Sequence, residues 1–118
     1  MLPNRVTLSK TATDKLRNIK GLTQLTPNVL ARVAIMLALR DGSGLVNASV
    51  ADANGQVLNR DVLFGEYAYI YEVLISEYVH EFDIDQPLAD VIVALIEIGV
   101  HKMGHVKSPS DVANLRCT

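Results

Sequence analysis

Basic side chains gather at the start of this 118-residue sequence, where they could bind a polyanion. The first forty residues hold seven of the eleven Lys and Arg residues but one of the thirteen acidic residues, a formal charge of +6 in a chain of net charge −2. Contacts between such side chains and phosphates release counterions, so the segment indicates nucleic-acid binding. The alternative is a solvated helix surface that only maintains solubility. The seven residues are Arg5, Lys10, Lys15, Arg17, Lys20, Arg32 and Arg40.

A second candidate is the histidine pair His101 and His105, whose spacing of four could place two imidazoles on one helix face for a metal. Lys102 stands where a zinc-protease motif has its glutamate, and Gly104 weakens the last helical turn. We therefore interpret the pair as the polar end of a helix, where partly positive side chains suit the dipole.

Neither the acidic residues nor the single thiol form a recognisable catalytic or metal site. The acidic group lacks the glycine and the ligand spacing of a calcium loop, so we interpret it as a solvated helix end. Cys117 alone provides no disulfide framework and no cluster ligands, although a persulfide acceptor is an alternative to an incidental residue. We expect no cofactor, no metal and no catalytic residue. The acidic group is Glu77, Glu81, Asp83 and Asp85.

A strand and a helix must position the basic residues. Residues 5–9 alternate between polar and apolar, which predicts a short strand with Val6 and Leu8 buried. Ser9 or Thr11 is expected to cap a helix that runs to about Lys20 and ends at Gly21. The outer face of this helix would carry Lys10, Asp14, Arg17 and Asn18, with Lys15 at its border.

The second predicted helix begins at Thr26-Pro27, a hydroxyl cap followed by a proline in the first turn, and ends at residues 41–44. It is apolar on nearly every side, which predicts burial against more than one neighbour. Together with an Ile- and Val-rich fourth helix, this apolar surface predicts a homo-oligomer.

The remainder of the chain is also predicted to be mainly helical. Asn54-Gly55 is a turn signal, flanked by Val50 and by Val57 and Leu58, and predicts a small hairpin or an ordered excursion of the chain. Further helices are expected over residues 60–78 and 88–103, separated by a linker at residues 82–87. The inward residues of the third helix would be Val62, Leu63, Tyr67, Ile70, Tyr71, Leu74 and Ile75. Tyr67, Tyr71 and Tyr78 are expected mostly in the core or at a subunit interface, not in base stacking, and Tyr69 is expected to be partly exposed.

The predicted fold class is mainly α, with a ribbon-helix-helix-like start followed by additional packed helices in one domain, residues 1–118. Residues 1–40 form the basic part and residues 60–118 the helical extension. In the ribbon-helix-helix plan two chains pair their strands into a ribbon that enters a DNA groove. Arg5, Thr7 and Ser9 would then face DNA, and the second helix would approach phosphate near Thr26.

The ordered set of short motifs along the chain resembles the DndE family, the small component of the bacterial DNA phosphorothioation system. The resemblance rests on residues 2–5 (LPNR), 8–10 (LSK), 14–17 (DKLR), 20–21 (KG), 26–28 (TPN), 30–32 (LAR) and 58–66 (LNRDVLFGE). It extends over roughly residues 2–115, including the helix end at residues 99–105.

The resemblance implies a cytoplasmic, self-associating protein that binds DNA, including nicked duplex, and works beside the other Dnd proteins. By position, Lys15, Arg17 and Lys20 are the matching basic residues. It also implies that the sulfur chemistry belongs to partner proteins. We therefore expect a non-enzymatic DNA-binding accessory subunit with no membrane association. The site residues would be Arg5, Lys10, Lys15, Arg17 and Lys20.

Two other functions remain open at this point. A DNA-nicking endonuclease would need carboxylates or His101 and His105 to gather a metal beside DNA. A ribbon-helix-helix transcriptional repressor would need a sequence-specific site, and the long helical extension exceeds what that role requires.

Overall fold

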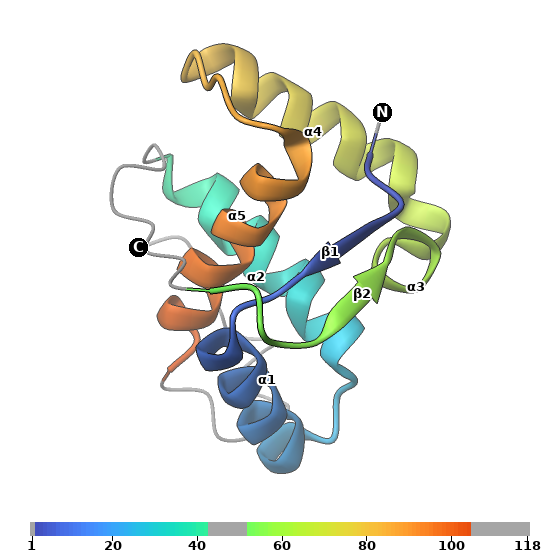
Figure 1. Ribbon diagram of the computed structural model, residues 1–118, viewed down its shortest axis with the longest axis vertical. Coiled ribbons are helices and arrows are strands. Elements are labelled where there is room, and N and C mark those ends of the chain that lie inside the picture. Colours follow the sequence, from blue (N-terminus) through green and yellow to red (C-terminus); the bar gives the residue numbers. More distant parts are fainter. Residues whose placement is uncertain (1, 43–51, 105–118) are drawn as a thin grey trace.

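The protein is mainly helical, and its first strand precedes two consecutive helices, as the sequence predicted (Figure 1). The computed structural model describes residues 2–42 and 52–104. The elements are β1 (Arg5–Thr7), α1 (Lys10–Thr23), α2 (Pro27–Asp41), β2 (Val57–Asn59), α3 (Arg60–Leu63), the 3-10 turn η2 (Gly65–Tyr67), α4 (Ala68–Glu81) and α5 (Leu88–Lys102).

The caps of α1 and α2 follow the sequence signals, with one exception. The Ser9 hydroxyl accepts a hydrogen bond from the Ala12 N–H, and Thr26 caps α2 in the same way. Gly21 does not end α1, because a glycine in a helix costs only about 1 kcal/mol and the next turn is fixed by the buried Thr23. The helix ends instead at Gln24, which adopts the left-handed conformation.

The strand β1 pairs with β2 of the same chain in an antiparallel two-stranded sheet, with Val6 opposite Leu58. The expected hairpin about Asn54-Gly55 is therefore wrong for Val57 and Leu58, whose partner lies some fifty residues earlier; Val50 lies outside the described residues. Gly55 serves close packing: its N–H donates to the Leu8 carbonyl, and a Cβ here would overlap the Thr13 hydroxyl and the backbone of Ser9.

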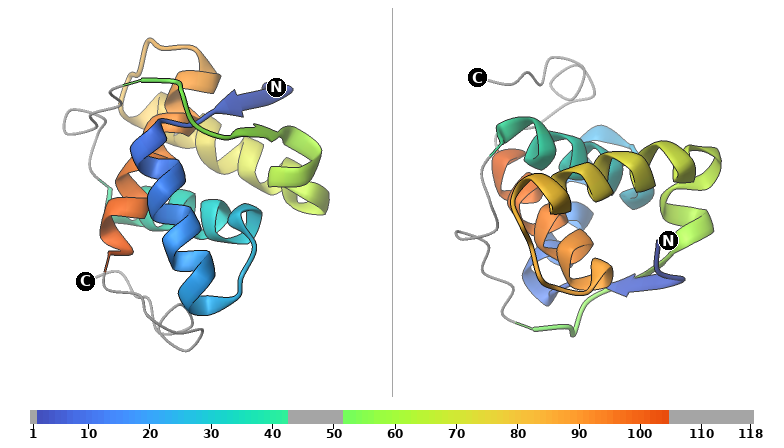
Figure 2. Two further views of the ribbon diagram at one scale, coloured as in Figure 1. Left: turned by 60° about the horizontal axis from the view of Figure 1, so that its bottom comes forward. Right: turned by 90° about the horizontal axis from the view of Figure 1, so that it is seen from above.

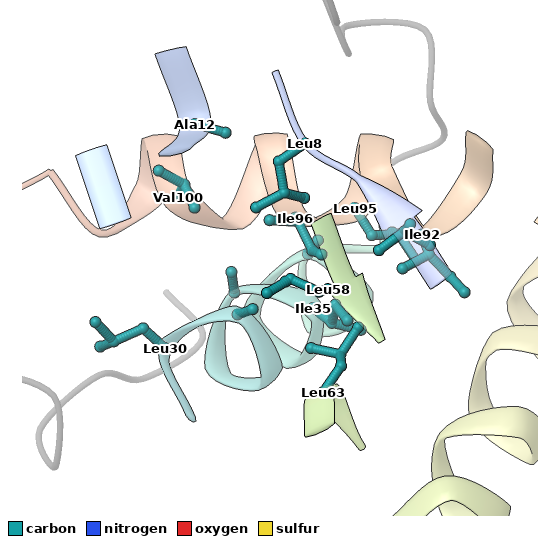
Figure 3. Close-up of a cluster of buried hydrophobic side chains, with 14 of the residues drawn as sticks. Leu8, Ala12, Leu30, Ile35, Leu58, Leu63, Ile92, Leu95, Ile96 and Val100 are labelled. Atoms are coloured by element: carbon teal, nitrogen blue, oxygen red, sulfur yellow. The ribbon is translucent and has the colours of Figure 1, made fainter. Parts of the chain in front are cut away.

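The core lies where α5 crosses α2 beneath the sheet (Figures 1 and 3). A Cβ on Gly99 of α5 would overlap the backbone of Ala34 in α2, so the absence of a side chain allows the two helices to touch. Helix α2 is apolar on nearly every side because α1, α3, α4 and α5 all pack on it. The labelled core residues in Figure 3 are Leu8, Ala12, Leu30, Ile35, Leu58, Leu63, Ile92, Leu95, Ile96 and Val100.

The predicted helix over residues 60–78 is broken into α3, η2 and α4. Gly65 follows α3 with a φ of +53°, a conformation that favours glycine and redirects the chain. Of the residues expected to face inward, Leu63, Tyr71 and Ile75 are buried. The others are exposed, and they are Val62 of α3, Tyr67 of η2, and Ile70 and Leu74 of α4. Ile70 and Leu74 are exposed because α4 contacts the core along one narrow side, which carries its buried residues.

No single helix in residues 2–42 and 52–104 is long and apolar enough to cross a membrane. By length and composition α1 and α2 pass that test only as a pair, and they meet at an angle of 111°. Figure 2 shows the two helices diverging from the turn that joins them.

Candidate nucleic-acid interface

All five basic residues expected to bind DNA are exposed, one on β1 and four on α1. At 100° per residue, Arg17 lies within about 20° of Lys10 around the helix axis, so these two side chains share one line on the outer face. Lys15 lies about 140° from Lys10, at the opposite border of the exposed face. The buried side is formed by Ala12, Thr13, Leu16, Ile19 and Thr23. The exposed side of α1 is therefore broad and basic.

Arg5 enters this surface from the strand. It is exposed on the face of the sheet opposite the buried Val6, and Thr7 on the same face is half-buried. β1 leads directly into α1, so Arg5 lies close in the chain to Lys10 (Figure 1). The strand itself is paired with β2 of its own chain along one edge, in contrast to the two-chain ribbon of the ribbon-helix-helix plan.

The expectation that Ser9 faces DNA is wrong. This residue is 1% exposed, and its hydroxyl donates to Glu97 Oε1 of α5 at 2.8 Å while accepting from the Ala12 N–H at 3.0 Å. The alternation that begins at Arg5 stops before Ser9, because the chain turns there into α1. Ser9 therefore fixes the start of the basic helix against the core.

The N-terminus of α1 is already occupied by Asp52, a residue that the sequence analysis missed. Its Oδ1 accepts hydrogen bonds from the backbone N–H groups of Lys10, at 3.0 Å, and Asn54, at 2.9 Å. The N–H of Asn54, followed by that of Lys10, holds the pKa of this carboxyl below its usual range. The Asp-x-Asn spacing is typical of a local side-chain turn and could have predicted the hydrogen bond to Asn54. No sequence signal predicts the hydrogen bond to Lys10, because Lys10 and Asp52 are 42 residues apart in the chain.

One acidic side chain stands within the basic face. Asp14 Oδ1 lies 3.7 Å from an Arg17 guanidinium nitrogen, one turn along α1, and both side chains are largely in solvent. Exposed pairs of this kind contribute about 0–1 kcal/mol, so Asp14 restrains Arg17 only weakly.

The remaining two arginines of the first forty residues point to another part of the molecule. Arg32 donates to the Leu63 carbonyl at 3.0 Å, and its guanidinium lies over the Tyr67 ring, 5.5 Å from the ring centroid. With Arg40, it lines a shallow groove of about 240 Å³ between α2 and α4. The basic residues of the first forty positions are therefore split between two surfaces, which composition alone could not reveal.

The start of α2 offers few backbone donors for a phosphate. Pro27 has no N–H, the Val29 N–H donates to the Thr26 hydroxyl at 3.4 Å, and the Leu30 N–H donates to the Thr26 carbonyl. Of the first helical residues, Asn28 is therefore the main one left to offer a backbone N–H for the expected phosphate contact near Thr26.

Within residues 2–42 and 52–104, no group of three or more His, Cys, Asp and Glu side chains could hold a metal ion. His101 is exposed in the last turn of α5, whereas His105 and Cys117 lie outside the described residues. The acidic residues Glu77, Glu81, Asp83 and Asp85 are exposed at the end of α4 and in the linker that follows.

Known proteins give a consistent family assignment. The crystal structure of DndE from Escherichia coli B7A, involved in DNA phosphorothioation modification, has a TM-score of 0.73 and 28% sequence identity, covering 87% of this chain and 98% of its own. A mutant DndE structure, also involved in DNA phosphorothioation, has a TM-score of 0.70 and 26% identity, covering 87% and 99%. No curated protein matches the sequence. The sequence profile described as "DNA sulphur modification protein DndE" matches residues 5–111, and the chain therefore belongs to the DndE family.

Proposed function

We propose that this chain is a non-enzymatic, DNA-binding accessory subunit of the cytoplasmic phosphorothioation machinery, which replaces a backbone phosphate oxygen with sulfur. The observation that carries this proposal is the exposed basic face of α1 and β1 in a member of the DndE family. Arg5, Lys10, Lys15, Arg17 and Lys20 would contact the phosphates of duplex DNA, including duplex that contains a nick.

Several features support binding without chemistry. The five side chains are exposed and carry one sign of charge, with Asp14 as the acidic residue among them on α1. Phosphate contacts position a protein on DNA without reading its sequence, which suits a subunit that delivers DNA to other enzymes. The sulfur chemistry would then be performed by the other Dnd proteins.

Binding of the full chain to short fluorescent duplexes, intact and with a central nick, tests the proposal. We expect measurable affinity for both duplexes, a fall in affinity with rising salt, and little dependence on base sequence. Absence of binding to both duplexes at low salt would contradict it. A strong preference for one sequence would instead favour the repressor.

The nicking alternative is tested with supercoiled plasmid. We expect no relaxed product when the protein is incubated with plasmid and Mg²⁺ or Mn²⁺, and no difference when EDTA is added. His101→Ala with His105→Ala should leave phosphorothioate in cellular DNA near normal. EDTA-sensitive nicking that the double substitution removes would replace our proposal with the endonuclease.

We also propose that the protein self-associates. The sequence predicted self-association from the apolar character of α2 and α5. In the fold, these two helices bury their apolar residues mostly against each other and their neighbours, so they support self-association less than expected. Support comes instead from large apolar side chains exposed on η2 and α4.

A further inference from the structure

The groove between α2 and α4, which we call the α2–α4 groove, lies outside the basic face that is proposed to bind DNA. Arg32 and Arg40 are the charged residues among the described residues that line it. They are eight positions apart on α2, a rise of about 12 Å along the helix axis. The right-hand view of Figure 2 shows α4 running alongside α2. The rest of the lining is apolar and consists of Val29, Val33, Met36, Leu37 and Tyr71.

Contacts between the two helices and their neighbours hold the groove in shape. The Tyr71 hydroxyl donates to the Arg32 carbonyl at 3.4 Å, which ties α4 to α2. The Arg32 guanidinium donates to the Leu63 carbonyl at 3.0 Å and lies over the Tyr67 ring. The bond to Leu63 uses one of the five N–H groups of the guanidinium. Because this side chain is already oriented, a ligand that binds it would immobilise little that is free.

The lining of the α2–α4 groove selects a class of ligand. Its arginines favour carboxylates or phosphates, while the surface between them is apolar and includes Met36, which is 36% exposed. Duplex DNA would supply phosphates but little apolar surface, since protein–DNA interfaces are polar and strongly charged. The groove volume of about 240 Å³ is also below the range of about 300–1,000 Å³ that is typical of small-molecule pockets. The lining therefore suits an acidic segment of a protein that also carries apolar side chains.

An amphipathic helix fits this combination of charge and shape. Apolar side chains at spacings of three and four lie along one side of a helix, and helices of this kind bind in hydrophobic grooves. Acidic residues about seven or eight positions apart on such a helix are separated by about 10–12 Å along its axis, close to the rise between Arg32 and Arg40. Two copies of this chain that met groove to groove would instead bring their arginines together, which is unfavourable.

We propose that the α2–α4 groove binds an amphipathic helix of another Dnd protein, with the apolar side of that helix in the groove and an acidic residue near each arginine. This inference rests on the proposed role as an accessory subunit and names the surface that a protein partner would use. The residues proposed to contact DNA lie on β1 and α1, so DNA and the partner helix would use different surfaces of the chain.

Photo-crosslinking in cells tests what occupies the groove. The full chain is expressed with the other Dnd proteins, with p-benzoylphenylalanine in place of Met36, and mass spectrometry identifies the cross-linked peptide. The same replacement at Val57, which is 49% exposed on β2, is the matched control. We expect position 36 to cross-link to a segment of another Dnd protein that has acidic and apolar residues at helical spacing, and position 57 not to cross-link to that segment.

A fluorescent peptide with the sequence of the cross-linked segment then measures the contribution of charge. We expect Met36→Asp and Arg40→Glu each to weaken peptide binding about tenfold or more, and Val57→Asp to leave it unchanged. Circular dichroism checks the folding of each variant, and Met36→Asp alone decides the result if Arg40→Glu unfolds. Binding of Met36→Asp to a short DNA duplex should equal that of the unmodified protein.

The outcomes separate the groove from the DNA-binding function. Cross-links from position 36 to DNA, to a second copy of this chain or to no molecule would each overturn the groove proposal and leave DNA binding by α1 unaffected. Unchanged peptide affinity in a folded Met36→Asp protein would also overturn it. A chain that cross-links to the partner helix but binds no duplex would contradict the proposed DNA-binding function alone.

Discussion

Asp14 is the acidic side chain on the outer face of α1, where it lies 3.7 Å from Arg17. Its charge opposes a DNA phosphate at the same place where Lys10 and Arg17 attract one. Because both partners are largely in solvent, the pair adds little to folding, and the main effect of Asp14 should be on binding.

We predict that Asp14→Asn tightens DNA binding by about two- to fivefold at low salt, an energy of the size expected for one exposed charge interaction. Fluorescence anisotropy with a short duplex measures the effect. Asp83→Asn makes the same change beyond α4 and should leave the affinity unchanged. Equal gains in the two variants would show that net charge, not the α1 face, controls binding.

Asp52 links the start of α1 to the segment that precedes β2. The backbone N–H groups that it binds lower its pKa, so its contribution to stability is present above the unfolded-state pKa of about 3.8 and is lost as the pH falls through the lower folded value. We predict that Asp52→Asn is less stable than the unmodified protein at pH 7, and that the difference disappears at strongly acidic pH. Urea unfolding at several pH values measures it; a difference that persists unchanged in acid would contradict the role of the charge.

At the scale of elements, two glycines should respond in opposite ways to the same substitution. Gly99→Ala would place a methyl group against the Ala34 backbone and force α2 and α5 apart, a destabilisation of about 1–3 kcal/mol. Gly21 lies within α1 and a Cβ there meets nothing within 4 Å, so Gly21→Ala should stabilise the protein by about 1 kcal/mol. Thermal unfolding compares the two variants, and a stable Gly99→Ala protein would contradict the close helix contact.

The elements whose signals are local could be predicted from the sequence. Thr26-Pro27 and Gly42 mark α2 through caps that depend on neighbouring residues alone, and Ser9 does the same for the start of α1. The partner of β2 could not be predicted, because three residues pair with a strand about fifty positions away. The face of α4 was misjudged for a related reason: Ile70 and Leu74 fit a helical period, but the period does not state which side another element covers.

The candidate site shows the same division between local and long-range information. Exposure of Lys10, Lys15 and Arg17 followed from the amphipathic pattern of one helix. The separate position of Arg32 did not, because its location depends on the Leu63 carbonyl and the Tyr67 ring, more than thirty residues away. Charge counting therefore predicted the basic surface but overestimated how much of it belongs to α1 and β1.

At the scale of the whole molecule, α2 and α5 hold the fold together, and their disruption should unfold it. Leu37 of α2 is nearly buried and belongs to the core, so we predict that Leu37→Asp unfolds the chain instead of producing a folded monomer. Met36→Asp changes the adjacent, exposed position of α2 and should remain folded. Circular dichroism and size-exclusion chromatography measure the two outcomes; a folded, monomeric Leu37→Asp protein would place a subunit interface on α2.

The charge of the molecule is separated along its length, with the basic α1 at one end and the apolar, partly acidic α4 at the other (Figure 1). The proposed DNA-binding face therefore lies at the end of the molecule opposite α4.

The salt dependence of DNA binding tests the central claim most directly. Each phosphate contact on duplex DNA contributes about −0.9 to the slope of log affinity against log salt concentration. Exchanging Lys15, Arg17 and Lys20 for Glu should therefore abolish binding at moderate salt. Any binding that remains at low salt should depend on salt with a slope shallower by about 2 to 3. The helical circular dichroism should be unchanged. Lys102→Glu, a reversal of charge on α5, should alter the slope little. A triple variant that is folded and binds with the affinity and slope of the unmodified protein would contradict the assignment of the DNA interface to α1.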